Sequence, residues 1–531
     1  MALAVLNSCA LLGMSSHLVR TEVHIGAGLP NFLLVGLAGP GVKESRDRVR
    51  TAISSSGFEF PVGRITANLS PADIPKETGR FDLPIAVGIL MATGQLRLSA
   101  AQYKTLLPHL YFVGELSLTG ALSSIQAPLI LALSIFKSDP KAILVMPRAD
   151  AAMAALVDGL TVIGANSLRE VVEHFESKHI IEASVPDSFS KYTAESTDSY
   201  FDAALCLSDV RGQEQACYLL ELAASGAHNI LFSGPSGVGK TMLAQRLPTI
   251  LPELSDLQRL ELLAIQSVSA NGIVDLGFRP PCRSPHHSIS DPALLGGGGQ
   301  AYPGEISLAH FGILLLDELA EFRRATLEAL RGPLEAGEIC ISRSYIQQIY
   351  PAKFQLVAAA NPCACGYLDH PELDCVCTHR AINQYQSRIS GPLLERIDIH
   401  HKVPPLTTNW LEAESAETSE VVRQRVSACR ELQLKRQGEL NAHLKGAQIK
   451  QYCFLSRELQ TVLELSIQQK AWSTRVVQSI LKIARTAADM RGVEAIERED
   501  LNVAISCRQP FSKKEEGRIY WHDVKKREHL S

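Results

Sequence analysis

The stretch SGPSGVGKT, Ser233–Thr241, fits the phosphate-binding loop pattern GxxxxGK[ST]. Residues 228–232 before it have the composition of a short buried strand, and residues 242–247 after it that of the start of a helix. Glycines let backbone N–H groups wrap around a phosphate, and the start of the helix adds a partial positive charge. The pattern in this context therefore predicts that the loop binds a nucleoside triphosphate.

Two residues of the loop are expected to have specific roles in binding ATP and Mg²⁺. Lys240 is expected to reach the β and γ phosphates of ATP, and the Thr241 hydroxyl is expected to bind Mg²⁺. The positions expected to contact ATP and Mg²⁺ are Gly234, Pro235, Ser236, Gly237, Val238, Gly239, Lys240 and Thr241.

Two further apolar runs end in polar residues. Residues 312–318, GILLLDE, predict a central parallel strand buried on both faces, which ends at Asp317 and Glu318. We expect Asp317 to hold the magnesium shell and Glu318 to orient and deprotonate the attacking water. The run 354–360 predicts the next buried strand. It ends at Asn361, which we expect to hydrogen-bond the γ-phosphate or the attacking water.

Four cysteines cluster just after this strand in a CxC–x9–CxC pattern. Four soft ligands in a short loop suit tetrahedral zinc. The spacing within each pair is one residue shorter than in the usual CxxC, so three interpretations stay open: a zinc knuckle, four reduced cysteines in a tight loop, or a redox-labile pair. The four residues are Cys363, Cys365, Cys375 and Cys377.

A segment rich in proline and glycine, residues 277–300, interrupts the nucleotide-binding fold. Its composition excludes regular structure and predicts an insertion loop. His286 and His287 in this loop have the chemistry to bind a metal, phosphate or DNA. Adjacent histidines in a loop more commonly serve simple polar packing, which we expect here.

The composition indicates a globular protein of several domains. The chain has 531 residues, 46% hydrophobic and 20% charged, with a net charge of −4. This length predicts two to four domains of about 100–200 residues each. The nearly balanced charge indicates no global affinity for nucleic acid. The scattered cysteines fit a reducing cytoplasm, and no apolar run reaches the roughly 20 residues of a membrane-spanning helix. The apolar start is expected to be the first strand rather than a signal peptide.

The N-terminal part resembles the proteolytic domain of Lon-type proteases in residues 76–88, KETGRFDLPIAVG, and 113–122, VGELSLTGAL. Where that family has its nucleophilic serine, this chain has Phe81 or Asp82. No lysine follows in residues 121–127 to act as the base. A Ser–Lys dyad needs both members, so we predict that this domain is not a protease.

The whole chain resembles the magnesium-chelatase-like AAA+ ATPases of the YifB/ComM group. The stretches that carry this resemblance include ANLSPADIPKETGRFDLPIA (67–86), FQLVAAANPCACG (354–366), RISGPLLERIDIH (388–400) and STRVVQSILKIARTAADM (473–490). The resemblance implies an ATPase that uses ATP and Mg²⁺, assembles as a hexameric ring and acts on DNA. For this family it also implies branch migration, which assists the integration of single-stranded DNA during natural transformation.

The resemblance also suggests parts for arginines and for a hairpin. Arg396 lies where AAA+ rings usually have an arginine finger, with Arg388 as the competing candidate and a surface salt bridge as the alternative. Arg475 begins a helix of the predicted lid, from which it is expected to reach the γ-phosphate as a second sensor. Residues 338–350 predict a β-hairpin, and such hairpins line the pore in related helicases. Arg343 and Lys353 are therefore the candidate DNA contacts.

The expected fold class is α/β, an AAA+ nucleotide-binding core with an all-α lid, preceded by an α+β Lon-protease-like domain. The expected boundaries are 1–182 for the Lon-protease-like domain, 183–204 for a linker, 205–405 for the core, 406–510 for the lid and 511–531 for a basic tail. The favoured function is a cytoplasmic DNA translocase or helicase. The alternatives are a chelatase-like motor that remodels a protein partner and, least favoured, an ATP-dependent protease.

Overall fold

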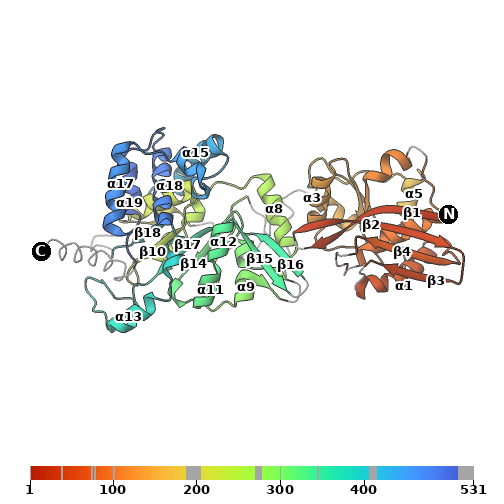
Figure 1. Cartoon of the computed structure of the whole chain (residues 1–531), viewed down its shortest axis with the longest axis horizontal. Helices are drawn as coiled ribbons and strands as arrows, with labels where there is room; N and C mark the ends of the chain where they lie inside the picture. Colours follow the sequence, from red (N-terminus) through yellow and green to blue (C-terminus); the bar gives the residue numbers. More distant parts are fainter. Residues whose placement is uncertain are drawn as a thin grey trace. The chain divides into compact units, whose positions relative to one another are not determined.

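The computed structural model contains two compact units. The first holds the elements from β1 to α5 together with most of α8 (Asp256–Ser267) and of β16 (Ile346–Pro351), and the second holds the other elements from α6 to α19 (Figure 1). The structure describes residues 2–12, 14–36, 40–72, 74, 76, 79–99, 102–186, 205–269, 278–298, 301–343, 346–405 and 415–511. The predicted linker from residue 187 onward and the predicted tail beyond residue 511 lie outside this description.

The first unit is built on a seven-stranded sheet with the strand order β3-β4-β2-β1-β5-β8-β9. Strands β1 and β2 pair antiparallel over their whole length, and β2 pairs antiparallel with β4, whereas the other neighbours run parallel. The apolar start of the chain is β1, as predicted. The strands are β1 (Ala2–Leu12), β2 (Ser15–Gly26), β3 (Asn31–Val35), β4 (Arg64–Ser70), β5 (Leu110–Phe112), β8 (Ile143–Pro147) and β9 (Thr161–Ala165).

The helices of this unit include one that is apolar on all sides. Helix α2 has nine buried residues and packs against β1 and β2, because a helix without a polar face is stable only when it is enclosed. The helices are α1 (Pro40–Ser55), α2 (Asp82–Ala92), α3 (Pro128–Ser138), α4 (Arg148–Ala154) and α5 (Leu168–Phe175).

The segment from Leu110 to Leu116 forms two separate strands instead of one. Strand β5 ends at Phe112, and a separate short pair follows, β6 (Glu115–Leu116) with β7 (Leu122–Ser123). The break lies at Gly114, whose N–H donates to Arg80 O and whose carbonyl accepts from Leu83 N–H, at 2.9 and 3.0 Å. These bonds tie the chain to the start of α2 instead of to the sheet.

The second unit is built on a five-stranded parallel sheet with the order β11-β14-β17-β10-β18. All residues of β14, β17 and β10 are buried, as expected for strands covered on both faces. The strands are β10 (Ile230–Ser233), β11 (Cys282–Arg283), β14 (Ile313–Leu316), β17 (Gln355–Ala360) and β18 (Ile399–Lys402).

Short helices and two small strand pairs surround this sheet. The pair β15 (Glu338–Arg343) and β16 (Ile346–Pro351) forms the hairpin that the sequence predicted, and β12 (Gly296–Gly297) pairs with β13 (Tyr302–Pro303). The helices are α6 (Glu214–Gly226), α7 (Lys240–Ala244), α9 (Asp291–Leu295), α10 (Glu305–Leu308), α11 (Arg324–Ala329), α12 (Arg331–Ala336), α13 (His379–Gln386) and α14 (Gly391–Leu394). The expectation that residues 277–300 contain no regular structure is wrong, because β11, α9 and β12 all lie within this stretch.

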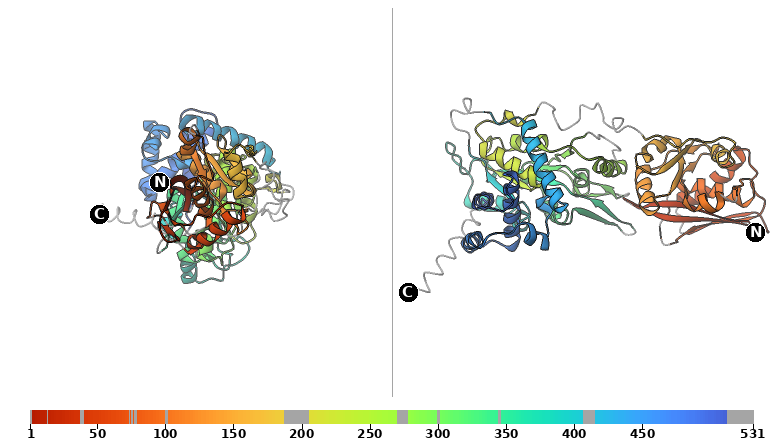
Figure 2. Two further views of the ribbon diagram at one scale, coloured as in Figure 1. Left: turned by 90° about the vertical axis from the view of Figure 1, so that its right-hand side faces the viewer. Right: turned by 90° about the horizontal axis from the view of Figure 1, so that it is seen from above.

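The C-terminal helices pack together as a separate group beside this sheet (blue in Figures 1 and 2). Helix α18 packs on α19 and on α6, and α15 also contacts α6. Ser473 caps α18 by accepting a hydrogen bond from Val476 N–H. The helices are α15 (Ser419–Gln437), α16 (Ala447–Tyr452), α17 (Arg457–Lys470), α18 (Thr474–Met490) and α19 (Arg498–Ser506). Among the described residues, none of the helices combines the length and the apolar character needed to cross a membrane.

Candidate nucleotide-binding site

The parallel sheet of the second unit brings three of the predicted stretches to one edge. Strand β10 ends at Ser233, β14 ends at Leu316 and β17 ends at Ala360, so the loop, the two acids and Asn361 all follow carboxyl ends of neighbouring strands. Ser233 is in register with Ala360. Ligands of open α/β sheets bind at this edge, where the strand order reverses. Strand β10 stands at such a position, between β17 and β18.

The loop after β10 has the backbone that its glycines permit. Gly234, Gly237 and Gly239 have φ values of +154°, +81° and +89°. A Cβ on Gly234 would lie 2.6 Å from the carbonyl oxygen of Val403, so a larger residue cannot fit there. At Gly237 and Gly239 a Cβ would meet no atom within 4 Å. The loop therefore has open space beside these two glycines.

The side chain of Lys240 folds back onto the phosphate-binding loop. Its Nζ donates hydrogen bonds to the carbonyl oxygens of Gly234 and Pro235, at 2.8 and 2.6 Å. Burial lowers the pKa of this ammonium, and the nearby carboxylate of Asp317 opposes that change. The side chain is thus held at the loop by weak neutral acceptors, which a phosphate can replace.

Thr241 and Asp317 meet although 76 residues separate them in the chain. The Thr241 hydroxyl donates to Asp317 Oδ2 at 2.8 Å, and Asp317 Oδ1 accepts from Glu318 N–H at 2.8 Å. A hydroxyl and a carboxylate side by side are hard oxygen ligands of the kind that Mg²⁺ prefers. This pair is the group of residues here that fits a magnesium ion.

Glu318 has an exposed carboxylate on an unusual backbone. Its φ and ψ are +50° and +47°, in the left-handed region that non-glycine residues rarely adopt. Such strain concentrates at functional positions. The side chain is 54% exposed, and its Oε2 lies 3.4 Å from His287 Nδ1.

His287 is a residue that the sequence reasoning underestimated. Its ring stacks against His286, with centroids 4.0 Å apart, and it meets the edge of Phe322. His286 instead contacts its own neighbour, Ser288 Oγ, at 2.8 Å. Simple polar packing describes His286, but His287 has the carboxylate of Glu318 as a partner. The HH dipeptide gave no sign of which ring would face the acid.

The predicted arginines have partners within this unit. Arg396 Nη2 lies 2.7 Å from Glu335 Oε2, and Arg475 Nη2 lies 2.8 Å from Glu335 Oε1. These hydrogen bonds, that of Arg475 first, hold the pKa of Glu335 below its usual range. Arg388, the competing finger candidate, pairs with Glu321 at 3.0 Å. Sequence reasoning missed Glu335, which joins two arginines that were predicted separately.

The other predicted residues are distributed as follows. Asn361 is half-buried directly after β17. Lys353 is exposed just beyond β16, and its backbone N–H donates to His310 Nδ1 at 3.0 Å. Arg343 ends β15, but its side chain lies outside the described residues.

The four clustered cysteines come together in space. Their sulfur atoms all lie within 4.8 Å of one another, and all four thiols are free. Sulfur–sulfur distances of 3.3, 3.7 and 3.5 Å join Cys363 to Cys365, Cys363 to Cys375 and Cys365 to Cys375. Among the described residues, this is the one group of three or more metal-ligating side chains close enough to share an ion.

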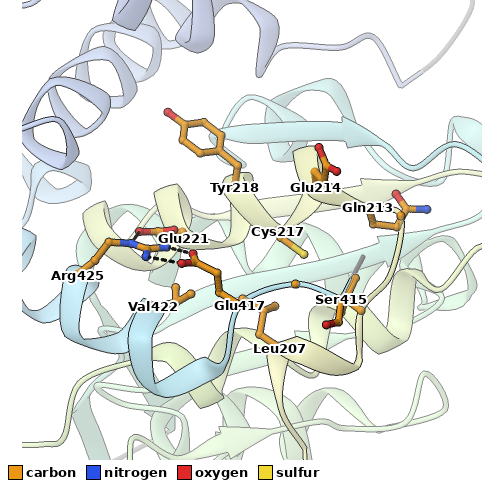
Figure 3. A pocket seen from close by; sticks show the side chains of 13 residues that line it. Leu207, Gln213, Glu214, Cys217, Tyr218, Glu221, Ser415, Glu417, Val422 and Arg425 are labelled. Atoms are coloured by element: carbon orange, nitrogen blue, oxygen red, sulfur yellow. Dashed lines mark hydrogen bonds and ion pairs between the residues drawn. The ribbon is translucent and has the colours of Figure 1, made fainter. Parts of the chain in front are cut away.

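A hollow of ≈ 380 Å³ lies between the start of α6 and the segment that leads into α15 (Figure 3). Its lining includes Glu221, Glu417 and Arg425 but none of the phosphate-loop residues. Arg425 reaches both carboxylates, with Nε 2.7 Å from Glu221 Oε1 and Nη1 3.1 Å from Glu417 Oε1. Two of the acids of this hollow, Glu221 and Glu417, are therefore neutralised by Arg425.

In the first unit, the two residues at which the sequence comparison expected a protease to have its nucleophile are not accessible to solvent. Phe81 and Asp82 are buried. Asp82 Oδ2 accepts from Arg48 Nε at 2.8 Å and from Leu116 N–H at 3.2 Å. Burial raises the pKa of the Asp82 carboxyl, against the hydrogen bonds of Arg48. The carboxylate is thus a fixed part of the core.

Three family models match the chain. "Magnesium chelatase, subunit ChlI" covers residues 206–411, "Subunit ChlI of Mg-chelatase" covers 21–150, and "Magnesium chelatase, subunit ChlI C-terminal" covers 416–508.

Full-length relatives are similar over nearly the whole chain. The uncharacterized protein YifB of Escherichia coli is 43% identical over 514 residues, which are 96% of this chain and 97% of that protein. The competence protein ComM of Haemophilus influenzae is 41% identical over 522 residues, 96% of this chain and 98% of that protein. The magnesium-chelatase 67 kDa subunit of Chlorobaculum parvum is 24% identical over 190 residues, 35% of this chain and 28% of that protein.

Proposed function

Because the chain belongs to the magnesium-chelatase-like family of YifB and ComM proteins, we propose that it is an ATP-driven, ring-forming motor that acts on DNA. The observation that carries the ATPase part is the 2.8 Å contact between Thr241 and Asp317 beneath the glycine loop, with Glu318 exposed beside it. These are the groups needed to hold a nucleotide with its magnesium ion and to activate water.

The loop residues bind the triphosphate. Backbone N–H groups of Gly237 to Thr241 face the phosphates, and Lys240 exchanges its two carbonyl acceptors for phosphate oxygens. Thr241 and Asp317 hold Mg²⁺ directly or through its water shell. Bound magnesium supplies positive charge against the phosphate oxygens.

Glu318 and Asn361 act on the attacking water. Glu318 accepts its proton as a general base, a part that suits an exposed carboxylate at the end of a strand. Asn361 follows the neighbouring strand β17 and donates a hydrogen bond that orients the water or the γ-phosphate.

Arg396 and Arg475 act as a pair. Because both guanidinium groups are engaged by Glu335, contact with a γ-phosphate requires this ion pair to open. In a ring, the phosphate of a neighbouring subunit is a stronger acceptor that can draw both arginines away from Glu335. We therefore propose Arg396 as the finger and Arg475 as the second sensor, both of which act once Glu335 releases them. Arg388, which is paired with Glu321, is the competing candidate for the finger. We propose a hexamer as the ring.

The DNA part of the proposal rests on the competence-related relative and on the hairpin of β15 and β16. Lys353 is exposed at the base of the hairpin, and Arg343 lies at its tip. Cationic contacts to the DNA backbone make binding steeply dependent on salt. We propose that the motor works in the cytoplasm and drives branch migration when single-stranded DNA integrates.

A second candidate is a motor that remodels a protein partner. The three matching models favour it, because they are named after a subunit of magnesium chelatase and their descriptions do not mention DNA.

One experiment separates these functions. ATP hydrolysis is measured without DNA and with single-stranded, duplex and branched DNA, with Lys240→Ala as the inactive control. Stimulation by DNA, and unwinding of a branched substrate, are the expected results. Hydrolysis that no DNA form changes would reject the DNA part and leave the protein-remodelling motor, whereas the lack of any hydrolysis would reject both.

A further inference from the structure

The four clustered cysteines have the spacing of a metal site rather than of disulfides. Four thiolates around Zn²⁺ at about 2.3 Å form a tetrahedron whose sulfur–sulfur edges are about 3.8 Å. The measured distances of 3.3, 3.5 and 3.7 Å lie close to this edge. A disulfide would need a sulfur–sulfur distance of about 2.05 Å. Soft thiolates without a carboxylate or water ligand select zinc over magnesium or calcium.

The backbone around the cluster also fits a metal knuckle. Leu368 N–H points to Cys363 Sγ at 3.4 Å, and Gly366 N–H donates to Cys363 O at 3.0 Å. N–H groups that face thiolate sulfur stabilise its negative charge and orient it toward the ion. The turn requires the left-handed backbone of Gly366, whose φ is +80°.

The cysteine loop touches the phosphate loop directly. The carbonyl of Gly366, the residue after Cys365, accepts a hydrogen bond from Ser236 N–H at 2.9 Å. A Cβ on Gly366 would lie 3.0 Å from Ser236 Cβ, which shows how close the two loops are. Ser236 stands in the middle of the phosphate-binding stretch, so the conformation of the cysteine loop bears on the loop that holds ATP.

The same loop begins beside the predicted sensor. Cys363 follows Asn361 by two residues, and Gln386 of α13 fixes the intervening Pro362 by donating to its carbonyl at 2.9 Å. An ion at Cys363 and Cys365 would therefore anchor the short segment between Asn361 and Gly366.

We propose that the four cysteines bind one Zn²⁺ ion and that this metal-loaded loop braces the phosphate-binding loop through the bond from Ser236 N–H to Gly366 O. The metal is structural, because all four protein ligands fill its tetrahedron and none of its positions remains open for substrate. The brace rests on the proposed nucleotide site, and the metal does not. Loss of zinc frees Gly366 and weakens nucleotide binding without removing any nucleotide-contacting side chain.

The metal is tested first, on the full-length protein purified under reducing conditions. Elemental analysis is expected to find about one zinc per chain, and replacement by Co²⁺ is expected to produce the strong near-ultraviolet thiolate absorption of a sulfur-rich site. The Cys363→Ser/Cys365→Ser variant is expected to lose both signals, and Cys340→Ser, an exposed cysteine outside the cluster, is expected to keep both. Equal, near-zero metal in all three proteins overturns the site.

The brace is tested by nucleotide affinity, measured without DNA by titration of a fluorescent ATP analogue. The double cysteine variant is expected to bind about fivefold to tenfold more weakly, on the scale of one lost backbone hydrogen bond. Gly366→Ala is the second variant, since it keeps every ligand but strains the turn against Ser236; it is expected to retain zinc and still bind the analogue more weakly. Unchanged affinity in both variants overturns the brace. If the unaltered protein fails to bind the analogue, the proposed nucleotide site fails and the brace with it, whereas the zinc content still decides the metal site.

Discussion

Asp82 in the first unit and Glu318 in the second are both acids at the start of a short turn or helix, yet their surroundings are opposite. Asp82 is fully buried, with Arg48 and a backbone N–H on its carboxylate. Glu318 is 54% exposed on a left-handed backbone, with His287 at 3.4 Å. A buried acid with satisfied oxygens stabilises a fold. An exposed acid on a strained backbone has free lone pairs for chemistry. Asp82 is therefore expected to be a structural carboxylate and Glu318 a catalytic one, and substitutions at the two positions test this distinction.

The largest expected effect is the loss of ATP hydrolysis when Glu318 is replaced. Glu318→Gln keeps the shape of the side chain but removes the base, so the hydrolysis rate should fall about 10²–10⁴-fold. Nucleotide affinity should persist, because Glu318 is not expected to hold the phosphates. The rate is measured under saturating ATP, and affinity by titration of an ATP analogue. Asp82→Asn is the matched control and should hydrolyse ATP at the unaltered rate; equal losses in both variants would contradict the distinction.

The second effect concerns the arginines held by Glu335. Arg396→Ala should reduce hydrolysis about 10³-fold, the lower end of the range for an arginine finger, whereas Arg388→Ala should have a smaller effect. If Arg396 acts on a neighbouring subunit, mixing Arg396→Ala with Lys240→Ala chains should restore part of the rate, because some interfaces then combine an intact loop with an intact arginine. A mixture no more active than its components would refute this action between subunits.

Most of the candidate site could be predicted because its chemistry is local in the sequence. The loop, Asp317, Glu318 and Asn361 each follow a short apolar run, and parallel strands bring such ends to one edge. The contacts of Glu335 and His287 could not be predicted. Glu335 is separated along the chain from its partners Arg396 and Arg475 by 61 and 140 residues, and His287 is separated from Glu318 by 31 residues. Neither periodicity nor a motif reports such a side-chain meeting. For the same reason the sequence does not show the break in the chain at Gly114, whose hydrogen-bond partners are Arg80 and Leu83.

The third effect is on stability and belongs to the first unit. Arg48→Ala leaves Asp82 as an unpaired buried charge, which should cost about 3 kcal/mol, the lower end for a buried pair because Arg48 is partly exposed. For a unit of this size the melting temperature should fall by roughly 6–12 °C, as followed by calorimetry. ATP hydrolysis per folded molecule should not change. An unchanged melting temperature in Arg48→Ala would show that the pair does not stabilise the fold.

The stability of Arg48→Ala is also expected to depend on pH. Burial already raises the pKa of Asp82, and Arg48 opposes it. Without Arg48 the folded-state pKa should rise further above its unfolded value of about 3.9. The folded protein then binds more protons than the unfolded one between these two pKa values, so the stability of Arg48→Ala should fall as pH rises through that window. The deficit relative to the unaltered protein should therefore be smaller at acidic pH than at pH 7, and a constant deficit would contradict the unpaired charge.

The smallest effect tests whether the exposed acid is positioned by its neighbour. His287 contacts Glu318 at a distance that is longer than a normal hydrogen bond, and both groups are open to solvent, so the contact can restrict the carboxylate but cannot hold it rigidly. His287→Ala should lower kcat about threefold to tenfold, which corresponds to about 1 kcal/mol for one polar contact, and should leave KM unchanged because no phosphate contact is lost. His286→Ala is the matched control, since its ring pairs with Ser288 instead. His287→Gln, which keeps a donor, should recover part of the rate, as a merely structural residue would not. If both histidine variants retain the full kcat, Glu318 is oriented by its own backbone, and the strain at φ +50° alone distinguishes it from Asp82.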